Sequence, residues 1–124
     1  MSGKRAKFSG GRNVAMKLPP DEFADTVVFY RDTLGLPVEF RSPTAVLVEF
    51  GPMRLWLDRI EGQRQAELWL EVVVDDADQA AKVLKEANVK RCDGVEPLPT
   101  GFRGFWIKNP AGLVHLVAEP GQDD

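Results

Sequence analysis

Apolar and polar residues alternate along short stretches of this chain, and helical spacing interrupts the alternation twice. Residues 13–18 alternate as a strand, and Pro19, Pro20 and the acids that follow are residue types that favour the first turn of a helix. That helix is expected to end at Gly35, because a residue without a Cβ atom enters the left-handed cap conformation freely. Three strand-like runs follow, separated by Ser-Pro and Gly-Pro turns, at 36–41, 44–50 and 53–59.

The second half of the chain repeats this order of elements. A strand at 66–73 precedes a helix that Asp75 and Asp76 can cap, and Asn88 occupies the place that Gly35 holds in the first half. The packing face of this helix is made by apolar residues three or four apart, namely Ala77, Ala80, Ala81, Leu84 and Ala87. Strands are then expected at 89–95, 102–108 and 113–119. The repeat predicts an internal duplication, with two strand-helix-three-strand modules at 13–60 and 66–119 in a single domain at 13–119.

Strand alternation predicts which side chains share a face of the sheet. The residues expected to face the helices are Val14, Met16, Leu18, Leu55, Leu57, Leu68, Leu70 and Val72. The closing hairpin turns at Asn-Pro-Ala-Gly, and its second strand carries the only histidine, which we place on the other face. That face is expected to collect Asn13, Trp56, Asp58, Glu67, Trp69 and His115. Because large aromatic side chains are poor solvated surface, we expect it to line a concave ligand pocket.

Composition limits the classes of function. A chain of 124 residues with 44% hydrophobic and 28% charged residues is typical of one globular domain. A net charge of -3 argues against a nucleic-acid partner, and the apolar runs are too short for a membrane span. One cysteine and no signal-peptide pattern favour a cytoplasmic location. Residues 1–12 are basic and lack an apolar period, so we expect a flexible arm there, with a short tail at 120–124.

Three motifs carry a resemblance to a known family. They are Asn13-Val14-Ala15-Met16 at the opening strand, Phe29-Tyr30-Arg31-Asp32-Thr33-Leu34-Gly35-Leu36 at the first helix end, and the stretch from Gly104 through Phe105-Trp106-Ile107-Lys108 to Gly112. With the paired modules, they resemble the vicinal oxygen chelate superfamily, which includes glyoxalase I, bleomycin-resistance proteins, fosfomycin-resistance enzymes and extradiol dioxygenases. The resemblance implies an α+β fold. In that fold two βαβββ modules curl into an open mixed-sheet barrel around a ligand cavity, with helices outside, often completed by homodimerisation.

The enzymes of this superfamily bind a divalent metal through His and Glu in the first and last strands of each module. By position, the resemblance carries these places to Asn13, Trp56 or Asp58, Glu67 and His115. Asn13 stands where a histidine is expected, the second module has Glu before His, and the spacing from the last turn to His115 is one residue shorter than usual. Two interpretations remain: Glu67 and His115 hold a divalent metal with Asp58 or Asn13 and water, or they form an ion pair that lines the pocket. We favour the ion pair and no metal cofactor.

Three hypotheses for function follow. The one we favour is a metal-free binding protein that sequesters a small aromatic or cationic compound between tryptophans and the acids Asp58, Glu67 and Glu71. The resemblance implies that this protein is a homodimer. Arg54 and Arg103 offer charge complementarity to an anionic ligand instead. The alternative is a divalent-metal-dependent lyase, isomerase, transferase or dioxygenase with Glu67 and His115 as ligands. A structural dimerisation module, with its cavity filled by side chains, is the third, since a tryptophan in a sheet is more often core or interface than ligand platform.

Overall fold

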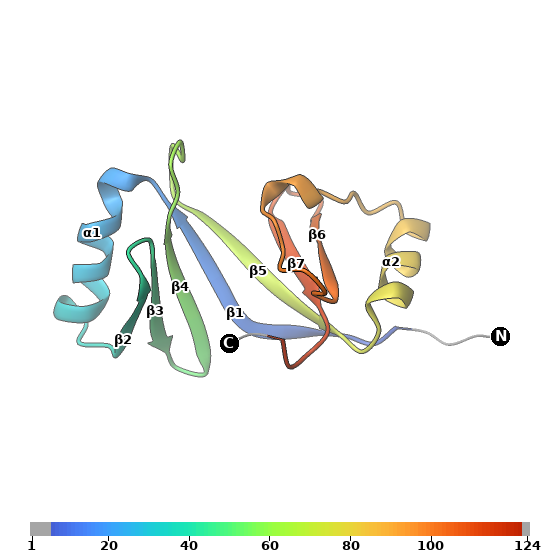
Figure 1. Cartoon of the computed structure of the whole chain (residues 1–124), viewed down its shortest axis with the longest axis horizontal. Coiled ribbons are helices and arrows are strands. Elements are labelled where there is room, and N and C mark those ends of the chain that lie inside the picture. Colours follow the sequence, from blue (N-terminus) through green and yellow to red (C-terminus); the bar gives the residue numbers. More distant parts are fainter. Residues whose placement is uncertain (1–5, 123–124) are drawn as a thin grey trace. The chain divides into compact units, whose positions relative to one another are not determined.

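The computed structural model describes residues 6–122, which form two compact units (Figure 1). The central unit is Arg12–Trp69, and the split unit consists of the described residues before Arg12 and after Trp69. Two long strands, β1 (Phe8–Leu18) and β5 (Glu67–Val74), contribute residues to both units. Within the described part of the chain, no helix is long and apolar enough to cross a bilayer.

The central unit is a complete βαβββ module. After β1 come α1 (Pro20–Val28), the π-helical turn η1 (Phe29–Thr33), β2 (Val38–Ser42), β3 (Ala45–Phe50) and β4 (Met53–Arg59). The strand order is β2-β3-β4-β1, with β4 parallel to β1 and the other neighbours antiparallel. The last strand of the module therefore returns beside its first strand.

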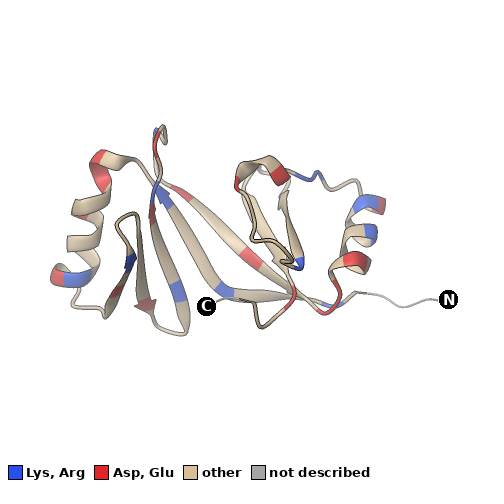
Figure 2. Ribbon diagram, viewed as in Figure 1, with Lys and Arg blue, Asp and Glu red and all other residues tan. Residues whose placement is uncertain are grey.

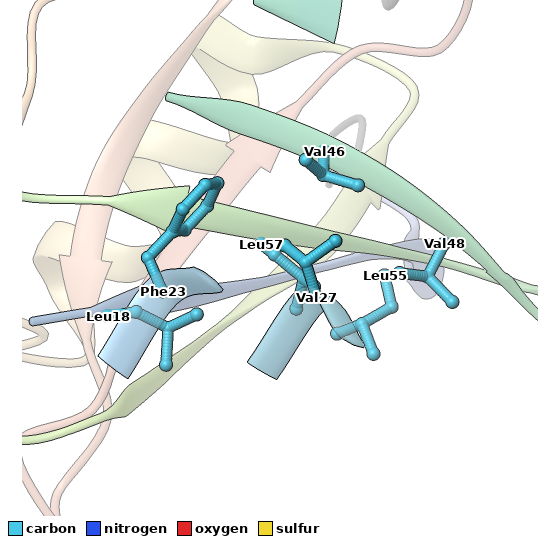
Figure 3. Packing of buried hydrophobic residues seen from close by; sticks show 7 residues of the cluster. All are labelled: Leu18, Phe23, Val27, Val46, Val48, Leu55 and Leu57. Carbon is cyan, nitrogen blue, oxygen red and sulfur yellow. The ribbon is translucent and has the colours of Figure 1, made fainter. Parts of the chain in front are cut away.

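Helix α1 covers one face of this sheet (Figure 3). Proline at the first helical position and two acids in the first turn start the helix, and Phe23 and Val27, one turn apart, are its buried residues. They pack with Leu18, Val46, Val48, Leu55 and Leu57, and Val14 and Met16 pack against this cluster. The helix-facing residues predicted for β1 and β4 are therefore confirmed.

The split unit contains β5, α2 (Ala77–Glu86), the 3-10 turn η2 (Asp93–Val95), β6 (Gly104–Lys108) and β7 (Val114–Ala118). Its strand order is β5-β7-β6, with β7 parallel to β5 and antiparallel to β6. The side chain of Asp76 accepts a hydrogen bond from the backbone of Gln79 and caps α2 as predicted, and Asn88 ends the helix region with φ 62. Each unit thus has an open mixed sheet with a helix, and the predicted α+β class is confirmed.

Two predicted boundaries are wrong. The expected strand at 89–95 is reduced to one bridge between Arg91 and Ile107, followed by η2. The cause is Asp93, whose carboxylate accepts a hydrogen bond from the backbone N–H of Trp106 at 3.1 Å and so takes the place of a strand carbonyl.

The expected flexible arm at 1–12 is also too long, because β1 already begins at Phe8. The remainder of that prediction at 1–5, and the end of the predicted tail at 123–124, lie outside the described residues. In the described part of the tail, the Gln122 side chain exchanges two hydrogen bonds with the backbone of Arg103.

Candidate functional site: the face of the central sheet opposite α1

The sheet face of the central unit that points away from α1 carries most of the chemistry predicted from the sequence. Because Leu55 and Leu57 face the helix, the alternate residues of β4 point to the other side, as do their partners on β1. We call the set Asn13, Lys17, Arg54, Trp56 and Asp58 the Trp56 face. The prediction that Asn13, Trp56 and Asp58 share one face is confirmed.

Asn13 and Trp56 form a hydrogen-bonded pair on this face. The indole Nε1–H of Trp56 donates to Oδ1 of Asn13 at 3.0 Å, and both residues are half-buried. The pairing satisfies the one polar group of the indole and fixes the ring against the sheet. These are two of the positions that the family resemblance links to metal ligands.

Two guanidinium groups flank the Trp56 ring. Arg54, two residues earlier in β4, lies 5.4 Å from the ring centroid, and Arg41, at the end of β2, lies 5.3 Å from it. Both distances are within the range of a cation–π contact. Trp56 therefore holds two positive charges on its own side of the sheet.

Lys17 is a buried cation that the site prediction omitted. Its ammonium lies 2.8 Å from Oδ2 of Asp58 and 4.3 Å from the ring centroid of Trp69. The Lys17 side chain is 5% exposed and that of Asp58 is 19% exposed. Alternation from Asn13 places Lys17 on this face, but lysine in a strand usually reaches solvent, so residue type alone gives no signal of a buried ion pair.

Glu67 and Trp69 form the other pair, on the part of β5 that belongs to the central unit. They are two residues apart in one strand and so share a face, and the indole Nε1–H of Trp69 donates to Oε1 of Glu67 at 2.6 Å. Lys17 links this pair to Asp58 through the Trp69 ring. The central unit thus brings together Asn13, Trp56, Asp58, Glu67 and Trp69.

His115 belongs to the split unit, and its predicted face is wrong. In β7, Val117 is fully buried in the cluster that includes Val74 of β5 and Ala80 of α2, so Val117 faces the helix. His115 is two residues away on the same strand and shares that face, beside Ile107 of β6 in the strand register. Its Nδ1 lies 3.1 Å from the backbone oxygen of Leu113.

The error at His115 has a physical cause. Val114 and Ala118, on the opposite face of β7, are as buried as Val117, so both faces of this strand are apolar and alternation gives no preference. The sequence did contain one signal of this error, because the spacing from the last turn to His115 is one residue shorter than usual. The next residue, Leu116, lies on the face where we expected the histidine.

Arg103, which the sequence suggested as an anion-binding residue, has a different role. Its guanidinium donates to Glu119 at 3.0 Å and to Asp78 at 3.2 Å, and these hydrogen bonds raise the pKa of Arg103 above its usual range. Glu119 also accepts from the backbone N–H of Ala77 at 2.8 Å. Arg103 thus joins β7 to the start of α2.

The carried-over positions do not fit a divalent metal. An indole N–H is no metal ligand, Asp58 is paired with an ammonium group, and Glu67 accepts a hydrogen bond from an indole. Among residues 6–122, no three His, Cys, Asp or Glu side chains are close enough together to hold a metal ion. We therefore assign no chemical step to a metal on this face.

A pocket of about 390 Å³ opens at the end of the central unit where β3 turns into β4. Its walls include Leu47, Glu49, Pro52, Met53 and Arg54, together with Arg12 from β1. Leu47 and Arg54 also border Trp56, the first as its cross-strand partner and the second through its ring contact. Sequence reasoning missed this pocket, because it depends on how the hairpin end meets β1.

Comparison with known proteins yields matches to solved structures. No protein-family model and no curated protein sequence matches the chain. The Mn(II)-bound glyoxalase from Novosphingobium aromaticivorans superimposes with a TM-score of 0.66 and 18% identity, over 92% of this chain and 40% of that one. Homoprotocatechuate 2,3-dioxygenase from Brevibacterium fuscum gives a TM-score of 0.66 and 18% identity, over 93% of this chain and 37% of that one.

A third structure is similar in length to this chain. The protein described as an NAD-dependent benzaldehyde dehydrogenase from Legionella pneumophila gives a TM-score of 0.58 and 16% identity, over 85% of this chain and 96% of that one. The chain spans less than half the length of the glyoxalase and the dioxygenase. At these identities the similarity concerns the fold.

Proposed function

We propose that this chain, which has the fold of the vicinal oxygen chelate superfamily, is a metal-free binding protein for a small aromatic compound. The ligand lies against the Trp56 face of the central unit. The proposal extends to a cytoplasmic homodimer. Large exposed apolar side chains such as Phe29 and Phe40, 46% and 58% exposed, support the dimer, and light scattering after size-exclusion chromatography tests it.

The hydrogen bond between Asn13 and Trp56 carries the proposal. The family resemblance links Asn13, and Trp56 or Asp58, to metal-ligand positions, whereas here the amide oxygen of Asn13 accepts a hydrogen bond from the indole of Trp56. The pair holds the indole ring in place, with the guanidinium groups of Arg41 and Arg54 5.3 and 5.4 Å from its centroid. A fixed, flat π-system recognises other flat molecules by stacking and excludes water from the contact.

The charges on the face favour an aromatic ligand over a purely cationic one. The Asp58 carboxylate already has the Lys17 ammonium at 2.8 Å, and Glu67 accepts from Trp69 at 2.6 Å. A ligand cation would have to compete with a buried ammonium for Asp58. An aromatic ring requires no such exchange.

Tryptophan fluorescence and calorimetry test the proposal. The protein is titrated with planar compounds that are neutral, cationic or anionic, and the titrations are repeated with Trp56→Phe and Trp69→Phe. We expect quenching and heat for the aromatic compounds, with affinity lowered in both variants. Trp106→Phe is the matched control, since Trp106 lies in the split unit and donates to the backbone of Glu96. Equal affinity in all variants, or no binding by any compound, would refute the proposal.

The second candidate function is the metal-dependent enzyme, favoured by the similarity in fold to a Mn(II)-bound glyoxalase. Elemental analysis of protein purified without chelator or affinity metal separates the two candidates. Stoichiometric Mn, Zn, Fe or Ni that is lost in both Glu67→Ala and His115→Ala would overturn the metal-free proposal. Assays for glyoxalase, fosfomycin-type transfer and dioxygenase activity would then follow.

A further inference from the structure

Strand β2 is the terminal strand of the sheet in the central unit, and among the described residues only β3 pairs with it. The backbone oxygen of Pro37 accepts a hydrogen bond from the N–H of Glu49 on β3 at 3.0 Å. Because the backbone groups of successive strand residues point in alternate directions, the N–H and C=O groups of Val38 and Phe40 point away from β3. The outer edge of β2 can therefore pair with a further strand.

The terminal strand of the split unit, β6, differs in this respect, because its own chain covers its edge. The backbone N–H of Cys92 donates to the oxygen of Trp106 at 3.0 Å, and that of Lys108 donates to the oxygen of Lys90 at 3.2 Å. No backbone segment covers the outer edge of β2 in this way within residues 6–122.

The side chains of β2 combine an exposed aromatic ring with two opposite charges. Phe40, at the centre of the strand, is 58% exposed, more than any other large apolar side chain in the described part of the chain. Glu39 and Arg41 flank it, and Figure 2 shows one acidic and one basic band on this strand. Proteins usually cover or shorten an edge that exposes apolar residues, because such an edge pairs with other strands. An exposed phenylalanine on this edge therefore indicates a partner.

We propose that the edge of β2 binds a second copy of this chain, with the two β2 strands antiparallel about a two-fold axis at Phe40. The inference rests on the homodimer of the proposed function and names its contact surface. In this register Phe40 opposes the second copy's Phe40, and Glu39 opposes the second copy's Arg41. The order Glu39-Phe40-Arg41 is thus complementary in charge to itself, which favours a second copy over a strand of another protein.

The pairing leaves the present contacts of Arg41 in place. Its Nε lies 3.5 Å from Oε2 of Glu39 and its guanidinium 5.3 Å from the Trp56 ring centroid. A guanidinium has several N–H donors, and Arg103 of this chain holds two carboxylates at once. A second carboxylate can therefore approach Arg41 from the other copy, since the Glu39 side chain is 64% exposed.

The geometry of β2 limits the assembly to two copies. The register of β2 against β3 shifts after Phe40, and this β-bulge keeps the regular part of the strand short. Each copy has one free β2 edge, and the two-fold contact uses both edges, so no further copy can add there.

Charge reversal tests the inference by analytical ultracentrifugation at rising protein concentration. Glu39→Arg would oppose two arginines in a homodimer, and Arg41→Glu would oppose two glutamates. Because the two-fold axis repeats each opposed pair, either variant alone should dimerise about ten-fold more weakly than the parent protein. An equimolar mixture of the two variants restores opposite charges and should recover the parent affinity. The pair within each chain stays broken in the mixture, so recovery reports on the contact between copies.

Two further measurements concern Phe40 itself. Phe40→Ser should weaken the dimer about ten-fold, whereas Phe8→Ser is the matched control, since Phe8 is 41% exposed and lies in the split unit. The Phe40 amide should exchange its hydrogen more slowly as the concentration of the parent protein rises, as followed by nuclear magnetic resonance. If a variant does not fold by circular dichroism, this exchange measurement decides.

The outcomes separate the contact surface from the proposed function. A dimer that survives all the β2 variants would lie elsewhere on the chain and overturn the inference, while the homodimer stands. Charge variants that fail to recover on mixing, or a Phe40 amide whose exchange ignores concentration, would also overturn it. A protein that stays monomeric at every concentration would overturn both the inference and the homodimer, whereas ligand binding is judged separately by the fluorescence titrations.

Discussion

Removal of the Asp58 carboxylate is the sharpest test of how the Trp56 face is built. The Lys17 side chain is 5% exposed, and its ammonium lies 2.8 Å from Asp58. An ammonium withdrawn from water loses several kcal/mol of hydration, which a close carboxylate can return. In Asp58→Ala the Trp69 ring at 4.3 Å keeps its contact with Lys17, but a cation–π contact is weaker than an ion pair.

The expected loss of stability in Asp58→Ala follows from the distance between the two charges and from their burial. At an effective dielectric constant near 20, two charges 2.8 Å apart attract by about 6 kcal/mol. Because Asp58 is 19% exposed, water screens part of this attraction, and we expect a loss of about 3 kcal/mol, at the lower end for a broken buried pair. At roughly 4 °C per kcal/mol, the melting temperature should fall by about 10 °C.

Urea unfolding followed by circular dichroism measures this change. The double variant Lys17→Met, Asp58→Ala should recover most of the lost stability, because both charges of the pair are removed together and the methionine keeps the apolar stem. Asp32→Ala is the control, since the Arg31–Asp32 pair is solvent-exposed and should contribute little. A loss below about 1 kcal/mol in Asp58→Ala, or a double variant less stable than the single one, would refute the assignment of a buried ion pair.

Three further predictions concern the split unit. In Gly104→Ala the new Cβ would lie 2.5 Å from a backbone oxygen of β7, so stability should fall by about 2 kcal/mol in urea, whereas Gly10→Ala, with nothing within 4 Å, should leave it unchanged. Asp76→Ala removes the cap of α2 and should lower thermal stability by about 1 kcal/mol, while Asp76→Asn should retain it; equal losses would contradict the cap. Burial raises the pKa of the Cys92 thiol, so iodoacetamide should react more slowly with the folded than with the urea-unfolded protein near pH 8, and equal rates would contradict this. The free energy of unfolding should also decrease as the pH rises past the ordinary thiol pKa, because only the unfolded chain then loses the thiol proton.

The sequence predicts β1 and β4 of the central unit well, because each of these strands buries one apolar face under α1 and carries polar groups on the other. In β4 apolar and polar positions alternate strictly. Leu55 and Leu57 face α1, and Trp56 and Asp58 lie on the opposite face, as predicted. In β7 the same method fails at His115, since Val114 and Val117 are both buried and each face is apolar.

Other features depend on contacts between distant residues, which a linear pattern does not contain. The expected strand at 89–95 is reduced to one bridge, because the Asp93 side chain accepts a hydrogen bond from the backbone N–H of Trp106 in place of a strand carbonyl. Likewise Lys17 is a polar residue in a strand by sequence, and only its register partner Asp58, on the neighbouring strand β4, makes it a buried cation. The pocket at the β3–β4 turn belongs to the same class of unpredicted features.

The acceptor groups of the Trp56 face, and of Glu67 on β5, already have hydrogen-bond or ion-pair partners, and this limits what can bind there. The amide oxygen of Asn13 accepts from an indole, the carboxylate of Asp58 pairs with an ammonium, and the carboxylate of Glu67 accepts from a second indole. A metal ion would have to break at least two of these interactions, one of them a buried ion pair, before it gained a ligand. An aromatic compound requires none of these oxygen atoms as a ligand, so it can lie against this face with all three interactions intact. The same interactions that make the site a poor metal centre are therefore compatible with an aromatic ligand.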